Sequence, residues 1–111
     1  MAGALQVRAE TLRSLANGGI SGSFAAVGSA LANPCRILVL TNATDADMIF
    51  SLDGTNNNFY VAHGAFKLFD FTTNRKYTDE TFALAAGVTV YVKQVSAPST
   101  GSVYVETIFG V

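Results

Sequence analysis

The sequence predicts an all-β protein, a single antiparallel β-sandwich with an extended N-terminal arm. Apolar and polar residues alternate with a period of two over most of the chain, and turn residues interrupt this pattern regularly, as is typical of sandwiches and barrels. The 111 residues suffice for one hydrophobic core but not two. Half of the residues are hydrophobic and 14% are charged, whereas an average globular domain has about 25% charged residues.

The N-terminal part, residues 1–22, is predicted to be an arm and hinge, and residues 23–111 to be the sandwich domain. Residues 5–16 fit a strand and also, as an alternative, a short helix, because their apolar positions satisfy both spacings. The following residues, 17–19, are Asn-Gly-Gly, which breaks either structure. Residues 20–31 are rich in Gly, Ser and Ala, too small to fill a core. We expect the arm to add edge strands and to have no partner within its own domain.

The strands of the domain are predicted from apolar runs between turn residues. Residues 36–42 are almost entirely apolar and follow Asn33-Pro34, which predicts a central strand. A turn built from Asn and Asp separates them from a second strand at residues 46–52. Further strands are expected at residues 59–62, 66–71, 81–85, 88–95 and 102–109.

The last two of these strands alternate most regularly, so we expect them to pair with each other as an antiparallel hairpin. The C-terminal strand is then apolar because it lies in the core of the sheet. The predicted core contains Ile37, Val39, Ile49, Leu68, Val90, Val92, Val103 and Val105.

Few residues offer catalytic chemistry. The single histidine, His63, and the single cysteine, Cys35, stand in no recognisable catalytic signature. We expect Cys35 to be a small buried hydrophobe and His63, beside Gly64, to be a turn residue. Two such residues do not supply the three or four ligands of a zinc site. The sequence therefore predicts that the protein is not an enzyme and needs no metal or cofactor.

The acidic residues Asp45, Asp47 and Asp53 are the one cluster that suggests a ligand. Loop carboxylates near a glycine bind calcium, but the spacing does not match the twelve-residue calcium loop and no terminal Glu follows. We therefore favour turn roles and keep calcium as the alternative. Aromatic residues such as Phe59 and Tyr60 suggest sugar stacking only weakly, because the chain has no Trp.

Charge and hydropathy argue against two classes of partner. The net charge is -1 and the seven Lys and Arg are scattered, so no basic patch is expected for nucleic acid. The longest strongly apolar run, residues 37–40, is too short to span a membrane. Residues 1–16 have no continuous apolar core and do not resemble a signal peptide. We expect neither a nucleic-acid nor a membrane partner.

Three stretches, residues 20–57, 64–74 and 90–110, together resemble small virion proteins of tailed phages. The closest resemblance is to the decoration (cement or staple) proteins of epsilon-fifteen-type short-tailed phages, and it extends over about residues 12–110. The resemblance implies a jelly-roll-like sandwich on the outer surface of an icosahedral capsid, where it clamps neighbouring major capsid proteins.

The resemblance also implies the partners and the location. The partners would be the major capsid protein and neighbouring copies of the same chain, with dimers as one arrangement. The protein would be made in the host bacterial cytoplasm and reside on the virion. Alternatives are another virion component, such as a head–tail or tail protein, and a small ligand- or carbohydrate-binding module. The residues that we expect to contact the capsid are Leu5, Val7, Leu12, Leu15, Phe59 and Tyr60.

The arm provides one experimental expectation. If residues 5–15 pack on a neighbouring subunit, then deleting residues 2–15 leaves the isolated domain folded and weakens its attachment to capsids.

Overall fold

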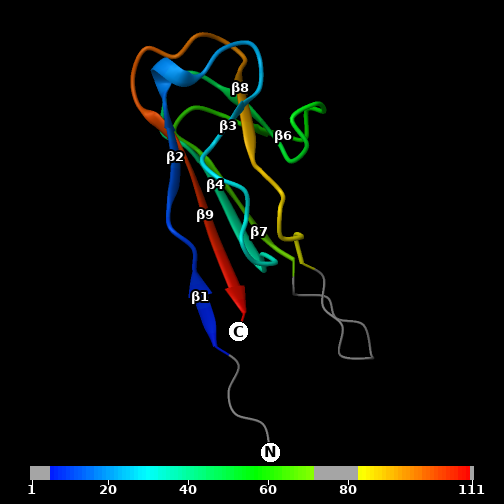
Figure 1. The fold of residues 1–111 in the computed structure, drawn as a ribbon. Coiled ribbons are helices and arrows are strands. Elements are labelled where there is room, and N and C mark those ends of the chain that lie inside the picture. The colour runs from blue at the N-terminus through cyan, green and yellow to red at the C-terminus, as the bar shows by residue number, and fades with distance from the viewer. Residues whose placement is uncertain (1–5, 72–82, 111) are drawn as a thin grey trace, which may run out of the picture.

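The computed structural model describes residues 6–71 and 83–110 and shows two antiparallel sheets packed face to face (Figure 1). This confirms the predicted β-sandwich. Apart from strands, the described residues contain one short 3-10 turn at Asn17–Gly19. The strands are β1 (Val7–Ala9), β2 (Arg13–Ala16), β3 (Ala25–Ala26), β4 (Ile37–Asn42), β5 (Met48–Ser51), β6 (Phe59–Val61), β7 (Phe66–Asp70), β8 (Tyr91–Gln94) and β9 (Ser102–Gly110).

The strand order is that of a jelly roll. Sheet A has the order β1-β9-β4-β7, with β2 also paired to β9, and sheet B has the order β3-β8-β5-β6. From β2 to β9 every connection crosses from one sheet to the other, except the one between β5 and β6. The jelly-roll-like architecture implied by the resemblance is therefore present.

The predicted hairpin between the last two strands is wrong. β8 pairs with β3 and β5 in sheet B, whereas β9 pairs with β4, β1 and β2 in sheet A. The connection between them, residues 95–101, crosses the end of the sandwich. It ends at Gly101, where φ is +86° and a Cβ would lie 2.0 Å from the carbonyl oxygen of Ala43. Only glycine fits this entry into β9.

The predicted core is half right. Val90, Val92, Val103 and Val105 are buried as expected. In β4, however, Leu38 and Leu40 point into the core, and Ile37 and Val39 are only half-buried on the opposite face. A similar exchange occurs in β5, where Met48 and Phe50 are fully buried instead of Ile49. Leu68 of β7, also predicted to be in the core, is 57% exposed. Both faces of β4 are apolar, so alternation did not identify the inward face.

The N-terminal segment is extended and forms edge strands, as predicted, but the expectation that it lacks a partner in its own domain is wrong. β1 pairs with the end of β9, from Ile108 to Gly110, and β2 pairs with its beginning, from Ser102 to Val105. The nine residues of β9 thus have β4 on one side and β1 and β2 on the other (Figure 1). The division of the chain at residue 22 stays a prediction.

A buried amide joins the strands at one end of the sandwich. The side chain of Asn42 is fully buried; its nitrogen donates to the carbonyl oxygens of Ala46, at 2.8 Å, and Val61, at 2.9 Å. Its oxygen accepts hydrogen bonds from the hydroxyl and the backbone N–H of Thr44. The end of β4 is thereby fixed to the segments before β5 and at the end of β6.

Candidate functional site

The residues predicted to contact a capsid do not form one surface. Leu5 lies outside the described residues. Val7 and Leu12 are exposed beside β9 in sheet A, while Leu15 of β2 is partly buried against the core. Tyr60, on β6 in sheet B, is 51% exposed. The remaining candidate, Phe59, packs against the ring of Phe69, with 4.6 Å between the ring centroids.

The outer face of sheet A gathers exposed large hydrophobic side chains, among them Leu12, Phe66 and Leu68. Inward and outward residues alternate along its strands, so the register gives its composition row by row. Across β7, β4 and β9 the outward rows are Asp70–Ile37–Ile108, Leu68–Val39–Glu106 and Phe66–Thr41–Tyr104. We call these nine residues, together with Leu12, the sheet A face.

Most of the sheet A face is hydrophobic. Phe66 is 64% exposed, Leu68 57% and Leu12 55%, while Ile37 and Val39 are half-buried between them. Large apolar side chains adjacent to one another on a sheet surface are uncommon in a monomer and mark a contact surface. Three of these residues, Ile37, Val39 and Leu68, were assigned to the core from the sequence. The signal for a second apolar surface was the uninterrupted run Ile37–Leu40, which is apolar on both faces.

A groove runs over part of this face. It has a volume of about 460 Å³, and Leu12 lies on one side of it and Ile37 and Val39 on the other. Glu106 and Tyr104 also line it. The second acid in its lining, Glu10, has its carboxylate bonded to Arg13 at 2.6 Å.

The outer face of sheet B is more polar. Lys93 of β8 lies opposite Ile49 and holds its ammonium 4.7 Å from the centroid of the Phe24 ring, a cation–π contact. On the other side of Ile49 lies Tyr60, whose hydroxyl donates to the carboxylate of Asp47. The apolar part of this face is therefore divided by charged and hydroxyl groups.

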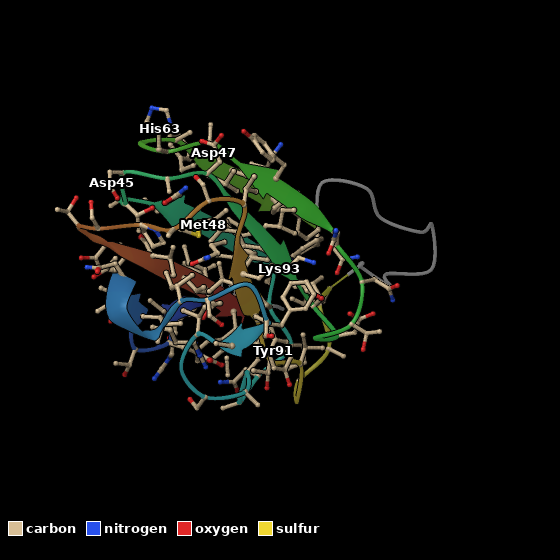
Figure 2. All side chains as sticks on the ribbon, turned by 90° about the horizontal axis from the view of Figure 1, so that it is seen from above. Asp45, Asp47, Met48, His63, Tyr91 and Lys93 are labelled. Carbon is tan, nitrogen blue, oxygen red and sulfur yellow. The ribbon has the colours of Figure 1, made fainter. Side chains whose placement is uncertain are left out.

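Asp45 and Asp47 stand just before β5 and Asp53 just after it, at opposite ends of that strand. Asp47 accepts hydrogen bonds from Tyr60 and from the backbone and ring of His63, with 3.0 Å between Nδ1 and the carboxylate (Figure 2). These contacts, with that of the Tyr60 hydroxyl the largest, lower the pKa of Asp47 to about 2. His63 stands in the turn between β6 and β7, as predicted. Its contact with Asp47 fixes that turn against the start of β5.

Asp45 and Asp53 each hold a separate loop. Asp45 accepts from the hydroxyl and N–H of Ser99 and from the N–H of Thr100, and these bonds lower its pKa to about 2. Asp53 accepts from the N–H groups of Thr55 and Asn56, both at 2.9 Å, which lowers its pKa further. Within residues 6–71 and 83–110, no three His, Cys, Asp or Glu side chains gather as metal ligands.

The thiol of Cys35 and the imidazole of His63 do not form a catalytic pair. Cys35 is buried, as predicted, and burial raises the pKa of its thiol. Its Sγ contacts the carbonyl oxygen of Ile37 at 3.0 Å. His63 is exposed at the turn after β6.

A buried ion pair that was not predicted from the sequence attaches the N-terminal segment. Glu10 and Arg13 leave 9% and 8% of their side chains exposed. Arg13 also donates to the carbonyl oxygens of Ser29 and Ala30, and Glu10 accepts from the backbone and side chain of Asn33. Burial raises the pKa of Glu10, but the hydrogen bonds from Arg13 and Asn33 more than offset it, so the pKa lies below its ordinary value.

In the part of the chain that the structure describes, no helix is long and apolar enough to cross a membrane.

Comparison with known proteins gives a weak structural likeness. Neither a family model nor a curated protein matches the chain. Among solved structures, it is similar to the SPBc2 prophage-derived protein YomS, with 14% identity and a TM-score of 0.33 over 100% of this chain and 98% of that one. A likeness at this level of identity and TM-score establishes neither a shared fold nor a shared function.

Proposed function

We propose that this chain is a structural virion protein, a capsid decoration protein that binds the outer surface of an icosahedral phage head and clamps neighbouring major capsid proteins. The sequence resemblance described above suggested this function. The proposal assigns the protein no catalytic role and no cofactor. It includes a location on the virion after synthesis in the host cytoplasm.

The observation that carries the proposal is the sheet A face. Leu12, Phe66 and Leu68 are each more than half exposed, and Ile37 and Val39 continue the apolar surface between them. A partner that covered these side chains would gain about 25 cal/mol of binding free energy for each Å² of apolar area removed from water. A protein whose role is attachment uses such a surface, and a rigid sandwich presents it without reorganisation.

Charge supports a protein partner over a nucleic acid. The chain carries a net charge of -1, and the two charged residues of the sheet A face, Glu106 and Asp70, are both acidic. Many copies with little net charge pack next to one another on a capsid without strong repulsion. Contacts between neighbouring copies, as dimers or along the lattice, belong to the same proposal.

The experiment is a count of copies on virions and a reconstitution on heads. Phage in which this gene is deleted should yield heads that lack the protein, and the purified chain should bind them saturably in co-sedimentation, with hundreds of copies per head. A dozen copies or fewer per virion would indicate a head–tail or tail component. If the protein is missing from purified virions and does not bind the heads, the proposed function is wrong.

A further inference from the structure

We infer that the sheet A face binds a protein surface that places a lysine or arginine on Glu106, with the rest of that surface apolar. This inference rests on the proposed function, because it names the chemistry by which the capsid protein would be recognised. Four observations lead to it: the position of Glu106, its apolar surroundings, the groove beside it, and the signs of the charges on the face.

Glu106 lies in the middle row of the sheet A face. It points outward from β9 between two buried residues, Val105 and Thr107. Along the strand its outward neighbours are Tyr104 and Ile108, and across the sheet its partner is Val39. On a sheet these positions lie about 5–7 Å away, so a partner that covers the apolar residues necessarily covers Glu106 as well.

Covering Glu106 without a counter-charge is unfavourable. A carboxylate that loses its water needs an opposite charge and hydrogen-bond donors, or the desolvation penalty offsets the gain from the apolar contacts around it. The described residues that line the groove include no Lys, Arg or His. The neighbouring Glu10 already holds Arg13, so the charge that completes this surface comes from the partner.

The shape of the groove fits a long basic side chain. The groove holds about 460 Å³ between Leu12 and the β4 residues Ile37 and Val39, with Glu106 in its lining. Lysine and arginine bury an aliphatic stem against apolar walls and place their charge at a polar end. Arginine in particular is enriched among the residues that dominate binding energy at interfaces.

The same charge argues against a second copy as the occupant. A two-fold contact centred on this face brings the Glu106 carboxylates of both copies together with no base between them, which is unfavourable. Arg13 is already bonded to Glu10, and another basic group, Arg36, lies beside Gly110 at the end of β9. A two-fold contact shifted toward Arg36 would leave Tyr104 and Phe66 uncovered at the opposite end of the face.

The test compares variants in binding to heads that lack the protein. Glu106→Lys and Glu106→Gln change only an exposed carboxylate, so their thermal melts should match the wild type. Loss of one partner of a covered charge pair should weaken binding about 30-fold or more for Glu106→Lys. Glu106→Gln should bind more weakly than the wild type and show a smaller dependence on salt, because the charge that salt screens is gone.

A matched pair of variants tests the apolar part. Leu12 and Val95 are 55% and 54% exposed, but only Leu12 lies on the sheet A face, whereas Val95 follows β8 of sheet B. Leu12→Ser should weaken binding to the heads and Val95→Ser should not. Sedimentation equilibrium of the free wild type, at the concentrations used for binding, should give a monomer or a dimer that Glu106→Lys leaves intact.

The outcomes separate the inference from the proposed function. If the wild type does not bind the heads, the proposed function fails and the inference fails with it. If the wild type binds and Glu106→Lys and Leu12→Ser bind equally well, the inference alone is wrong. A dimer that Glu106→Lys or Leu12→Ser dissociates would identify a second copy as the occupant and also overturn it.

Discussion

Among the described residues, Asn42 is the one whose side chain makes the most buried hydrogen bonds, and its removal should be costly. Asn42→Ala leaves the carbonyl oxygen of Val61 and the N–H of Thr44 without their side-chain partner. Because a buried polar group without a partner costs about 1–3 kcal/mol, we expect the free energy of unfolding to fall by about 2–4 kcal/mol in urea titration. The control is Asn17→Ala, whose amide donates to Gly101 at the surface and which should lose less than about 1 kcal/mol. Equal losses in both variants would contradict the prediction.

Asp45 predicts how stability depends on acid. Hydrogen bonds from Ser99 and Thr100 lower its folded-state pKa from 3.8 to about 2, so the ionised form favours the folded state. This contribution is complete above the unfolded pKa and is lost as the pH falls from about 4 through about 2. Melting temperatures should therefore drop over this range, and less so in Asp45→Asn. Ser99→Ala should lower the melting temperature at pH 7, and adding it to Asp45→Asn should change little more, because both remove one contact. Additive losses would show that the contact does not contribute.

We expect the acidic turns not to bind calcium, which was the alternative interpretation of their sequence. Asp45, Asp47 and Asp53 lie on separate turns, where each already accepts hydrogen bonds: Asp53 from its own loop, Asp45 from Ser99 and Asp47 from His63. An ion would have to displace these donors. Melting curves recorded with calcium and with a chelator should coincide, and a rise of several degrees with calcium would instead establish a site.

Residue type predicted the turn role of Asp53 well, because it accepts hydrogen bonds from the N–H groups of Thr55 and Asn56, two and three residues on. Asp45 and Asp47 also lie in turns, but their hydrogen-bond donors, at Ser99 and His63, are far along the chain, so no local pattern identifies these contacts. The ion pair of Glu10 and Arg13 could not be found in this way. Its partners lie at Ser29, Ala30 and Asn33, and contacts over such distances in the chain depend on the whole fold.

At the scale of the element, most strands were predictable, but the inward faces of β4 and β5 were not. Turn residues placed β4, β5, β6, β7 and β9 close to their observed bounds. The run Ile37–Leu40 offers an equally apolar set to either side, and the sheet resolves the choice by burying Leu38 and Leu40. The predicted hairpin between β8 and β9 was wrong because a jelly roll sends most consecutive strands to opposite sheets.

The attachment of β2 depends on Arg13, so Arg13→Met should be strongly destabilising. The substitution removes the counter-charge of Glu10, whose side chain is 9% exposed. Breaking one partner of a buried pair costs about 3–5 kcal/mol, which urea titration should show. Arg8→Met removes an exposed arginine from the adjoining strand β1, where it contacts Gln6, and should change stability by less than about 0.5 kcal/mol. Similar effects of the two substitutions would argue against the ion pair.

The expected result of the N-terminal deletion changes for the same reason. Deleting residues 2–15 removes β1, three of the four residues of β2 and the ion pair with Glu10, so we now expect the isolated domain to lose stability. Deleting residues 2–9 removes β1, whose residues are exposed, but keeps β2 and the ion pair, and should leave most of the stability intact. Thermal melts of the two truncated proteins and of the full chain test this, and a melting temperature of the 2–15 deletion equal to that of the full chain would restore the original expectation.

For the molecule as a whole, β9 is the strand that the sandwich cannot lose. It pairs with β1, β2 and β4 and contributes the buried Val103 and Val105. A chain that stops after residue 101 leaves sheet A without its central connection and should not fold, which far-UV circular dichroism and proteolysis would show. A protease-resistant, β-rich fragment would contradict this prediction.

The place of β9 in the sheet also determines when the protein can fold during synthesis. The ribosome makes β1, β2 and β4 long before β9, yet the two halves of sheet A meet only through β9. Until residues 102–110 have left the exit tunnel, the nascent chain exposes Leu38 and Leu40 with no strand between β4 and β2. We therefore expect folding to wait for β9, and the apolar side chains exposed during that interval to make the nascent chain prone to aggregation.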